Sequence, residues 1–445
     1  MSSLDPAWAP VLPRTAAATA DGHLSLGECD AVELAREFGT PLYIFDEEEL
    51  RSTAREYREA FASRYAQSAV AYAAKAYLGR WIASVMAEEG LGLDVVSGGE
   101  LAVARSAGFP LERVLFHGSN KSAQELREAV EAGVGRVVID NFHELALLDD
   151  IAGSLGRRQP VLLRVSPNVD AHTHVKTTTG VLDTKFGIPI DSGQAEEAIV
   201  QVQARANLEL VGLHCHLGSP VMAIEPYWQA NDVMISFARE MREKHGLELR
   251  DYSPGGGFAA RYLRDTPVPS HEQYAEAVVE SLREALDRND MPEPMLIVEP
   301  GRALVARAGV ALYTVGARKE MPGVRTYVSV DGGMADNIRP AMYDSKYEAL
   351  VANRIGEPPV ERVTIAGKYC ESGDVLLRDV ELPKLWAGDV LAMPGSGAYQ
   401  LAMASNYNLA PRPPIVVVRD GHARLVRRRE TYEDLMLTEV WGEGL

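Results

Sequence analysis

The sequence predicts an α/β protein that consists of a (β/α)8 barrel of the TIM type and a second, mostly β-sheet domain. From residue 69 onward, short apolar strands alternate with amphipathic helical segments and turn residues. Eight strand-then-helix units occur before residue 304, which is a usual length for such a barrel. Beyond residue 304, strands continue with few long helices between them. A doubly wound sheet is the alternative, but polar residues follow nearly every strand, as expected for the top face of a barrel.

The expected elements follow one another along the chain. The barrel strands are expected at 69–76, 91–97, 113–118, 135–140, 160–166, 208–218, 249–254 and 294–300, and the clearest helices at 123–133 and 271–288. Later strands are expected at 304–315, 326–330, 360–366, 374–382, 389–393 and 415–418, with a hairpin turn at Arg419-Asp420-Gly421. The apolar stretch 41–45 needs a partner strand. We therefore expect residues 46–304 to form the barrel, and residues 1–45 with 305–445 to form the β domain.

The charge balance and the cysteines exclude several functional classes. The chain has 45 basic and 63 acidic residues and a net charge of −18, which argues against a nucleic-acid or anionic-membrane surface. No apolar run approaches the length of a membrane span, and the N-terminal stretch lacks the apolar core of a signal peptide. Cys29, Cys215 and Cys370 have neither disulfide-framework nor metal-site spacing, so we expect a cytoplasmic protein.

Lys75 is the residue around which the predicted chemistry is organised. It lies at the end of an apolar strand, in Tyr72-Ala73-Ala74-Lys75-Ala76, where a buried ammonium group is costly unless it is paired or loses its proton. Desolvation lowers the pKa of a lysine and frees its lone pair, as a Schiff-base lysine requires. The alternative is a lysine whose ammonium group reaches solvent from the strand end.

Glycine-rich turns follow three strands and could bring backbone N–H groups to a phosphate. They are Ser97-Gly98-Gly99-Glu100, Gly255-Gly256-Gly257 and Asp331-Gly332-Gly333. The turn at 255–257 is the best candidate, because it follows the seventh strand, where the phosphate site of a barrel usually lies. A tight turn without a ligand is the alternative for each of them.

Two further strand ends carry groups suited to an aromatic cofactor. His214 and His216 share one face of the sixth strand, where an imidazole ring could stack on a cofactor ring. Metal binding is conceivable, but no third ligand lies at suitable spacing, so we expect no metal site. Glu299 ends the eighth strand, and a carboxylate that faces a pyridine nitrogen keeps it protonated and strengthens the ring as an electron sink. An internal ion pair of Glu299 with Arg302 is the alternative.

The predicted β domain supplies the remaining candidates. Cys370 stands before Glu371 and is either structural or a proton donor. Arg339 offers a guanidinium fork that matches a carboxylate. Tyr343 and Tyr399 offer phenol groups that donate hydrogen bonds.

In this order, these stretches resemble the diaminopimelate decarboxylases, a lysine-biosynthetic family of alanine-racemase-fold (fold type III) pyridoxal phosphate enzymes. The resemblance covers nearly the whole chain and also rests on Ser405-Asn406-Tyr407-Asn408. Two further stretches point to this family rather than to its relatives. They are His172-Thr173-His174 with Thr179-Gly180, and Lys185-Phe186-Gly187-Ile188.

The resemblance implies a role for each matching residue. Lys75 looks like the Schiff-base lysine, Cys370 like the general acid, and His216 like the histidine that stacks on the cofactor ring. The residues that resemble cofactor contacts are Lys75, His216, Ser219, Gly256, Gly257, Glu299, Gly301, Arg302 and Tyr399. Those that resemble substrate contacts are Arg302, Arg339, Tyr343, Glu371 and Tyr399.

The reaction that the resemblance implies is decarboxylation of meso-2,6-diaminopimelate to L-lysine and CO2 with pyridoxal 5'-phosphate, the last step of lysine biosynthesis. The resemblance also implies a homodimer in which the loop of Cys370 reaches the active site of the neighbouring subunit. Three alternatives stay open. They are a racemase, against which Glu299 argues; a decarboxylase of ornithine, arginine or carboxynorspermidine; and a cofactor-binding relative without activity.

Overall fold

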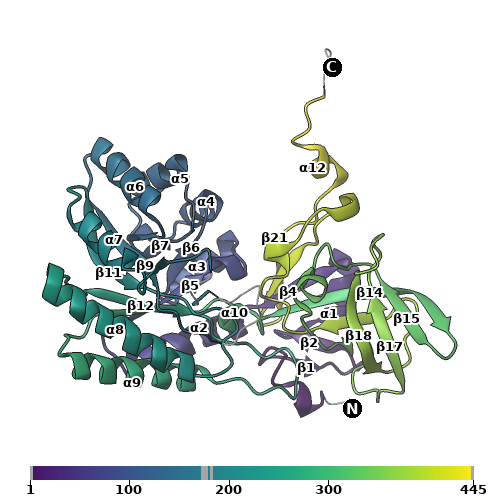
Figure 1. Cartoon of the computed structure of the whole chain (residues 1–445). Coiled ribbons are helices and arrows are strands. Elements are labelled where there is room, and N and C mark those ends of the chain that lie inside the picture. Colours follow the sequence, from purple (N-terminus) through teal and green to yellow (C-terminus); the bar gives the residue numbers. More distant parts are fainter. Residues whose placement is uncertain (1–3, 172–178, 181–183, 442–445) are drawn as a thin grey trace. The chain divides into compact units, whose positions relative to one another are not determined.

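The computed structural model describes residues 4–171, 179–180 and 184–441, which fall into two compact units (Figure 1). The barrel unit contains Arg51–Ala259 and Val268–Leu304. The β unit contains Met1–Leu50, Ala260–Pro267 and Val305–Leu445, so it is assembled from segments far apart in the sequence.

In the described part of the barrel unit, eight parallel strands close into a ring, which confirms the predicted fold class. In order they are β5 (Ser68–Ala73), β6 (Gly92–Val95), β7 (Val114–Phe116), β8 (Arg136–Ile139), β9 (Gln159–Ser166), β11 (Leu208–His214), β12 (Asp251–Gly256) and β13 (Met295–Glu299). The pairing of β13 with β5 closes the ring. The short β10 (Ile188–Pro189) pairs with β9.

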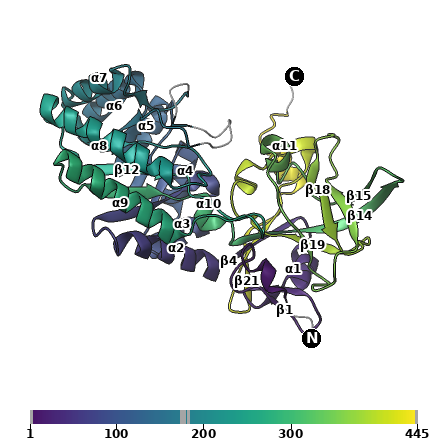
Figure 2. The same ribbon diagram turned by 60° about the horizontal axis from the view of Figure 1, so that its bottom comes forward.

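A helix follows each barrel strand, and the helices surround the ring (Figures 1 and 2). Reciprocal capping boxes begin two of them, at Ser122 with Glu125 and at Ser270 with Gln273. The helices are α3 (Arg80–Glu88), α4 (Gly98–Ser106), α5 (Ala123–Ala132), α6 (Phe142–Ser154), α7 (Gln194–Gln203), α8 (Glu225–His245), α9 (His271–Asn289) and α10 (Arg302–Val305), and α2 (Glu47–Ala62) precedes β5.

Small and branched apolar side chains fill the inside of the ring. They are Ala71, Leu115, Val138, Leu162, Val211 and Ile297, and each is at most 7% exposed. Because this layer is packed, the barrel is a solid core and not a pore. Polar side chains at the carboxyl ends of the strands are therefore left to form a site at one end of the ring.

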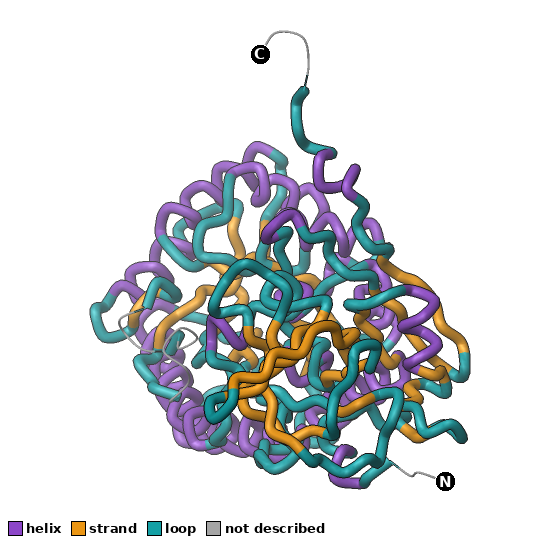
Figure 3. Tube along the Cα trace, turned by 90° about the vertical axis from the view of Figure 1, so that its right-hand side faces the viewer, coloured by secondary structure: helices purple, strands orange, loops and turns teal. Residues whose placement is uncertain are grey.

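The β unit is built on one large mixed sheet with the order β18-β17-β15-β14-β4-β20-β21. Figure 3 draws the strands of the chain in orange. The N-terminal segment takes part in this sheet, since β4 pairs with both β14 and β20. Two shorter strands, β16 and β19, extend the sheet from β14. The strands are β4 (Leu42–Asp46), β14 (Gly309–Met321), β15 (Arg325–Val330), β16 (Leu350–Val351), β17 (Glu361–Ala366), β18 (Val375–Leu382), β19 (Val390–Met393), β20 (Ile415–Arg419) and β21 (His422–Arg427).

The predicted hairpin is confirmed, because Asp420 and Gly421 join β20 to β21 with φ values of 49° and 74°. The prediction of a strand from residue 304 is wrong at its start: a helical turn, α10, comes first, and β14 begins at Gly309.

None of the helices in the described part of the chain combines the length and apolar surface that a membrane crossing requires. The smaller elements are β1 (Ala17–Ala18), β2 (Leu24–Leu26), β3 (Cys29–Asp30), α1 (Ala31–Phe38), α11 (Arg339–Tyr343) and α12 (Tyr432–Met436).

Candidate active site

Lys75 lies in a single 3₁₀ turn, η2 (Ala74–Ala76), directly after β5 ends at Ala73. Its Nζ is 3.4 Å from Oδ2 of Asp94 on β6, and the Asp94 side chain is 1% exposed. The Lys75 side chain is 41% exposed, so the expectation of a buried ammonium group is wrong. The reason is that the chain turns before Lys75, which takes this side chain out of the buried layer of the strand. A buried carboxylate, and not an apolar wall, faces the amine.

Glu299, the last residue of β13, is buried and is held by side chains from two other strand ends. His214 Nε2 lies 3.0 Å from Oε2, and the hydroxyl of Ser253 donates to Oε1 at 3.0 Å. Burial opposes the charge of Glu299, but His214 and His117 outweigh burial and hold the pKa of the carboxyl well below its usual range. Burial also lowers the pKa of His214, so the neutral ring donates its Nε2–H to an ionised carboxylate.

A third imidazole, His117, follows β7 and faces two carboxylates. Its Nε2 is 3.4 Å from Glu299 Oε1 and 3.7 Å from Asp94 Oδ1. Its ring meets the His214 ring edge-on, with centroids 4.8 Å apart. Ligand atoms of His117, His214 and Glu299 lie within 4.8 Å of one another, a cluster that the sequence spacing of His214 and His216 did not indicate, and the predicted lack of a metal site stays a prediction. Hydrogen bonds from His214 and Ser253 account for the Glu299 carboxylate without an ion.

The loop at the end of β12 places backbone N–H groups beside His216. The N–H of Gly256 donates to His216 Nδ1 at 3.2 Å. Burial is the main cause that holds the pKa of His216 well below its usual range, so the ring is flat and neutral. Gly257 must be glycine, because its φ is +95° and a Cβ would lie 2.3 Å from the Gly218 carbonyl oxygen.

These groups fit pyridoxal phosphate in charge and shape. In the described ranges, the N–H groups of Gly257 and Gly301 donate to no protein acceptor, which leaves them for an anion. The Arg302 guanidinium lies 3.4 Å from the Ser219 hydroxyl and adds a cation and a further donor. A phosphorylated pyridine ring requires these donors together with a flat neutral partner, which His216 provides.

Residues 185–188, one of the stretches behind the resemblance, are anchored beside β9. The Arg164 guanidinium of β9 lies over the Phe186 ring at 4.5 Å, and its Nε is 3.7 Å from Asp140 Oδ1. The N–H of Gly187 donates to the same Asp140 oxygen at 3.0 Å. The companion stretch, His172-Thr173-His174, lies outside the described residues.

In the β unit, Arg339 lies among aromatic side chains at the start of α11. Its guanidinium is 5.3 Å from the Tyr343 ring centroid and 5.6 Å from that of Tyr399. Its Nε donates to the Tyr347 hydroxyl at 3.0 Å, and the residue is 8% exposed. The structure therefore brings together three of the predicted substrate contacts around one guanidinium group.

Cys370 and Glu371 are exposed on the loop between β17 and β18. The buried carboxylate of Asp374 fixes this loop, since it accepts the N–H of Tyr369 at 2.8 Å and the N–H of Met334 at 2.6 Å. The thiol of Cys370 is thus carried on a tethered loop and is open to a reaction partner.

A pocket of about 540 Å³ in the β unit is lined by segments that flank the predicted substrate contacts. Pro340, next to Arg339, lines one part of it. Gly373, in the loop of Glu371, lines another part. These two predicted substrate segments therefore border one cavity.

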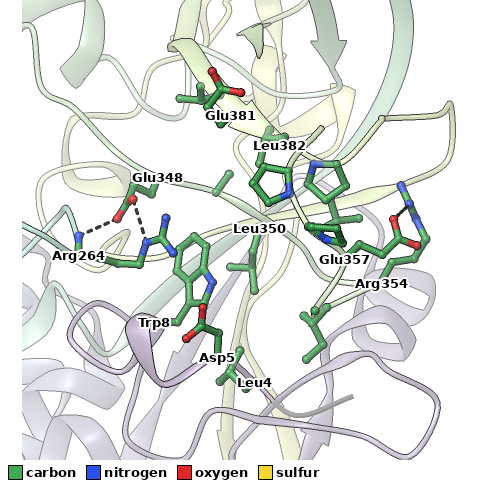
Figure 4. Close-up of a pocket in the computed structure, with 18 residues that line it drawn as sticks. Leu4, Asp5, Trp8, Arg264, Glu348, Leu350, Arg354, Glu357, Glu381 and Leu382 are labelled. Carbon is green, nitrogen blue, oxygen red and sulfur yellow. Dashed lines mark hydrogen bonds and ion pairs between the residues drawn. The ribbon is translucent and has the colours of Figure 1, made fainter. Parts of the chain in front are cut away.

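Another pocket of the β unit, of about 610 Å³, has a different lining (Figure 4). The Arg264 guanidinium lies 4.0 Å from the Trp8 ring centroid and donates to Glu348 at 3.0 Å. The other residues that line this pocket are mainly apolar or paired, and none of the predicted site residues is among them.

Sequence reasoning missed Asp94, His117, Arg164 and Ser253. A usable signal existed for Asp94 and Arg164, because each is a charged residue inside an apolar strand run. His117 follows the apolar run of β7 directly, and an imidazole directly after a strand was a signal of the same kind as His216, which lies two residues after β11. Ser253 gave no signal, because a serine in a strand is ordinary.

Known proteins resemble this chain along most of its length. A family model described as "Pyridoxal-dependent decarboxylase, pyridoxal binding domain" matches residues 47–306. The diaminopimelate decarboxylase of Bacillus subtilis (strain 168) is 47% identical over 419 residues, which cover 94% of this chain and 95% of the relative.

Solved structures show the same likeness. Diaminopimelate decarboxylase from M. jannaschii, in complex with L-lysine, is 38% identical with a TM-score of 0.90 and covers 96% of this chain and 98% of its own. The Helicobacter pylori enzyme, also complexed with L-lysine, is 32% identical with a TM-score of 0.84 over 91% of this chain and 98% of its own.

The likeness extends over both units and not over the barrel alone, because each of these relatives is covered almost completely. It confirms the resemblance that the ordered motifs indicated, and the residues of the barrel site fit the cofactor of the matched family. The chain therefore belongs to the diaminopimelate decarboxylases, a family of pyridoxal phosphate-dependent decarboxylases.

Proposed function

We propose that this chain converts meso-2,6-diaminopimelate to L-lysine and CO2, the last step of lysine biosynthesis. The observation that carries the proposal is the Glu299 carboxylate, which is ionised although it is buried at a strand end. A carboxylate that keeps a ring nitrogen protonated suits the loss of CO2, whereas a racemase needs a weaker electron sink.

The barrel residues bind and tune the cofactor. Pyridoxal 5'-phosphate, when bound, accepts the electron pair that the departing carboxylate leaves on the α carbon. Lys75 would supply the amine that holds the cofactor, and Asp94, 3.4 Å from that amine, would position it through its charge. Glu299 would hold a proton at the ring nitrogen, and His216 would offer its flat neutral face to the ring. The phosphate contacts are assigned to Ser219, Gly256, Gly257, Gly301, Arg302 and Tyr399.

The substrate contacts come from residues that orient the far end of a diamino acid. Arg339, with Tyr343 and Tyr399 beside it, binds the distal carboxylate. Glu371 binds the distal ammonium group, and the Cys370 thiol returns a proton to the carbon that lost CO2. We assign cofactor binding to residues 46–304, and substrate and dimer contacts to residues 1–45 and 305–445.

The relatives give this substrate class its support. L-lysine, the proposed product, is the ligand in the structures from M. jannaschii and Helicobacter pylori. The identity of 38% to the first of them extends over both units. The predicted cytoplasmic location is consistent with three free cysteines and stays a prediction.

We also propose a homodimer in which the loop of Cys370 completes the partner's active site. Surface chemistry supports this, because Cys370 is exposed and the C-terminal segment leaves large apolar side chains in solvent. Tyr432 is 72% exposed and Trp441 is 94% exposed, and such a series marks an association surface. Light scattering of the full chain should give a dimer, and a chain that ends at Glu430 should dissociate more readily. A monomeric full chain would contradict the proposal.

The decisive experiment measures CO2 release by the purified chain with added pyridoxal phosphate. The substrates are meso-diaminopimelate, L-ornithine, L-arginine and L-lysine, with the absorbance of the bound cofactor followed in parallel. We expect release from meso-diaminopimelate alone. Release from another diamino acid instead would reject the proposed substrate. A cofactor band without any CO2 release would leave a cofactor-binding relative and overturn the reaction.

A further inference from the structure

His117 has a position that the proposed reaction leaves unexplained. Its side chain is 6% exposed, and it faces two carboxylates that serve opposite ends of the cofactor. Asp94 holds the amine of Lys75, and Glu299 is assigned to the ring nitrogen. We propose that His117 is a positioning residue that joins these two carboxylates into one buried charge network, so that the covalent end and the nitrogen end of the cofactor are tuned together. This inference rests on the proposed function for the roles of Lys75 and Glu299.

The geometry is a continuous series of polar contacts. Lys75 Nζ lies 3.4 Å from Asp94 Oδ2, and the other oxygen, Oδ1, lies 3.7 Å from His117 Nε2. His117 Nε2 lies 3.4 Å from Glu299 Oε1, and Glu299 Oε2 lies 3.0 Å from His214 Nε2. Each carboxylate therefore turns one oxygen toward His117 and the other toward a different partner. His117 therefore bridges the two carboxylates and does not form an isolated pair with one of them.

The second observation is that Asp94 Oδ1 has no hydrogen-bond donor among the described residues. Asp94 Oδ1 is buried and accepts no hydrogen bond from the described residues, and His117 Nε2, also buried, donates none of normal length. The two atoms are 3.7 Å apart. A buried carboxylate oxygen without a donor is costly, so a small movement of the His117 ring toward Asp94 Oδ1 is favourable, while Glu299 Oε1 lies at 3.4 Å on its other side. The ring can thus shift its N–H between Asp94 and Glu299 as the charges at the two ends change.

Other charged groups surround this network and set its background. Arg164 of β9 supplies positive charge to both Asp94 and Glu299. Burial raises the pKa of Glu100, on α4 beside Asp94, to about 7. The groups that approach from neighbouring elements are Lys75 after β5, Glu100 on α4, Arg164 on β9, and His214 and His216 at the end of β11. His117 lies between the two carboxylates, with Nε2 3.7 Å from Asp94 Oδ1 and 3.4 Å from Glu299 Oε1.

The first test replaces His117 with asparagine, whose amide is polar but too short to reach both carboxylates. The absorbance of the bound cofactor is titrated with pH, and we expect its midpoint to move by about one unit, which is a tenfold change in the protonated fraction. We expect kcat to fall about tenfold with KM within about twofold, because His117 does not touch the substrate. His143, exposed on α6, gives the matched control His143→Asn, which should leave both readouts unchanged.

The second test is a double-mutant cycle of Asp94→Asn with His117→Asn, read by the same midpoint. If His117 couples the two ends, the two shifts are not additive, because the first substitution has already broken the network. Additive shifts, or an unchanged midpoint in folded His117→Asn, would overturn the inference. If His117→Asn does not fold, His117→Gln replaces it in the cycle and is judged by the same additivity.

The two proposals fail in different ways. A wild-type chain that shows neither a cofactor band nor CO2 release overturns the proposed function. If the wild-type chain shows both the cofactor band and CO2 release, but the midpoint shifts of the double-mutant cycle are additive, only the proposed network is overturned.

Discussion

Lys121 ties the loop after β7 to β8 and, through a buried ion pair with Glu144, to α6, and we expect Lys121→Met to destabilise the chain. Lys121 Nζ is 2.6 Å from Glu144 Oε1, and the two side chains are 1% and 2% exposed. The ammonium group also donates to the carbonyl oxygens of Val138 at 2.7 Å and Gly118 at 2.9 Å. Methionine fills the space of the lysine stem but leaves these three acceptors without their donor.

The expected loss in the free energy of unfolding follows from the Glu144 carboxylate, which Lys121→Met leaves without its partner. Three hydrogen bonds from a charged donor are worth roughly 1.5–3 kcal/mol each, but the released cost of burying the ammonium group offsets part of their sum. Breaking one partner of a buried pair costs about 3–5 kcal/mol, which is the loss we expect for Lys121→Met. The double variant Lys121→Met/Glu144→Leu no longer buries a charge, so it should recover more than half of that loss.

The assay is urea unfolding of the full chain with cofactor present, at several pH values. Burial raises the pKa of Glu144 to about 7, above its value of 4.5 in the unfolded chain, so folded stability falls as pH rises from about 4.5 to about 7. Lys121 counteracts this rise, so its removal moves the folded pKa higher and extends the loss above pH 7. A loss below about 1 kcal/mol, or a double variant no more stable than the single one, would refute the reasoning.

Three further predictions concern the site itself. Lys75→Ala should abolish CO2 release and the band of the covalently bound cofactor while circular dichroism stays unchanged; turnover at the wild-type rate would contradict the mechanism. Gly257→Ala should weaken cofactor binding by about 100-fold in a titration of the apoprotein, because its Cβ meets a carbonyl oxygen at 2.3 Å, whereas Gly193→Ala, which also has positive φ but open space, should bind normally. Asp374→Ala should loosen the loop of Cys370 and lower kcat about tenfold with unchanged cofactor affinity, and an equal loss of cofactor binding would argue against this separation of roles.

The fold was predictable because its signals are local. The alternation of apolar strands with amphipathic helices can be recognised in short segments of the sequence. The turn at Asp420-Gly421 can be recognised in the same way. The ends of parallel strands gather at one end of a barrel. Lys75 and Glu299 could therefore be recognised as site candidates before their contacts were known.

The contacts themselves were not predictable, because they depend on ring closure. Asp94, His117 and Glu299 are widely spaced in the sequence, and no spacing rule connects them. The exposure of Lys75 depends on where β5 stops, and a shift of two residues in that boundary decides whether the amine is buried. Sequence patterns locate strand boundaries less well than they locate strands.

The charged residues of this site lie on strands that neighbour one another in the barrel, and their partners come from these neighbouring strands. The neighbouring strands β13, β5, β6 and β7 carry Glu299, Lys75, Asp94 and His117 at or just after their carboxyl ends. Each of the two anions thus has a cationic or imidazole partner from another strand, and none of the four residues has its partner on its own strand. Replacing one of them leaves a buried charge uncompensated, which costs more than the lost contact itself. We therefore expect these positions to behave as one unit, in which single substitutions are disproportionately harmful and paired ones are not additive.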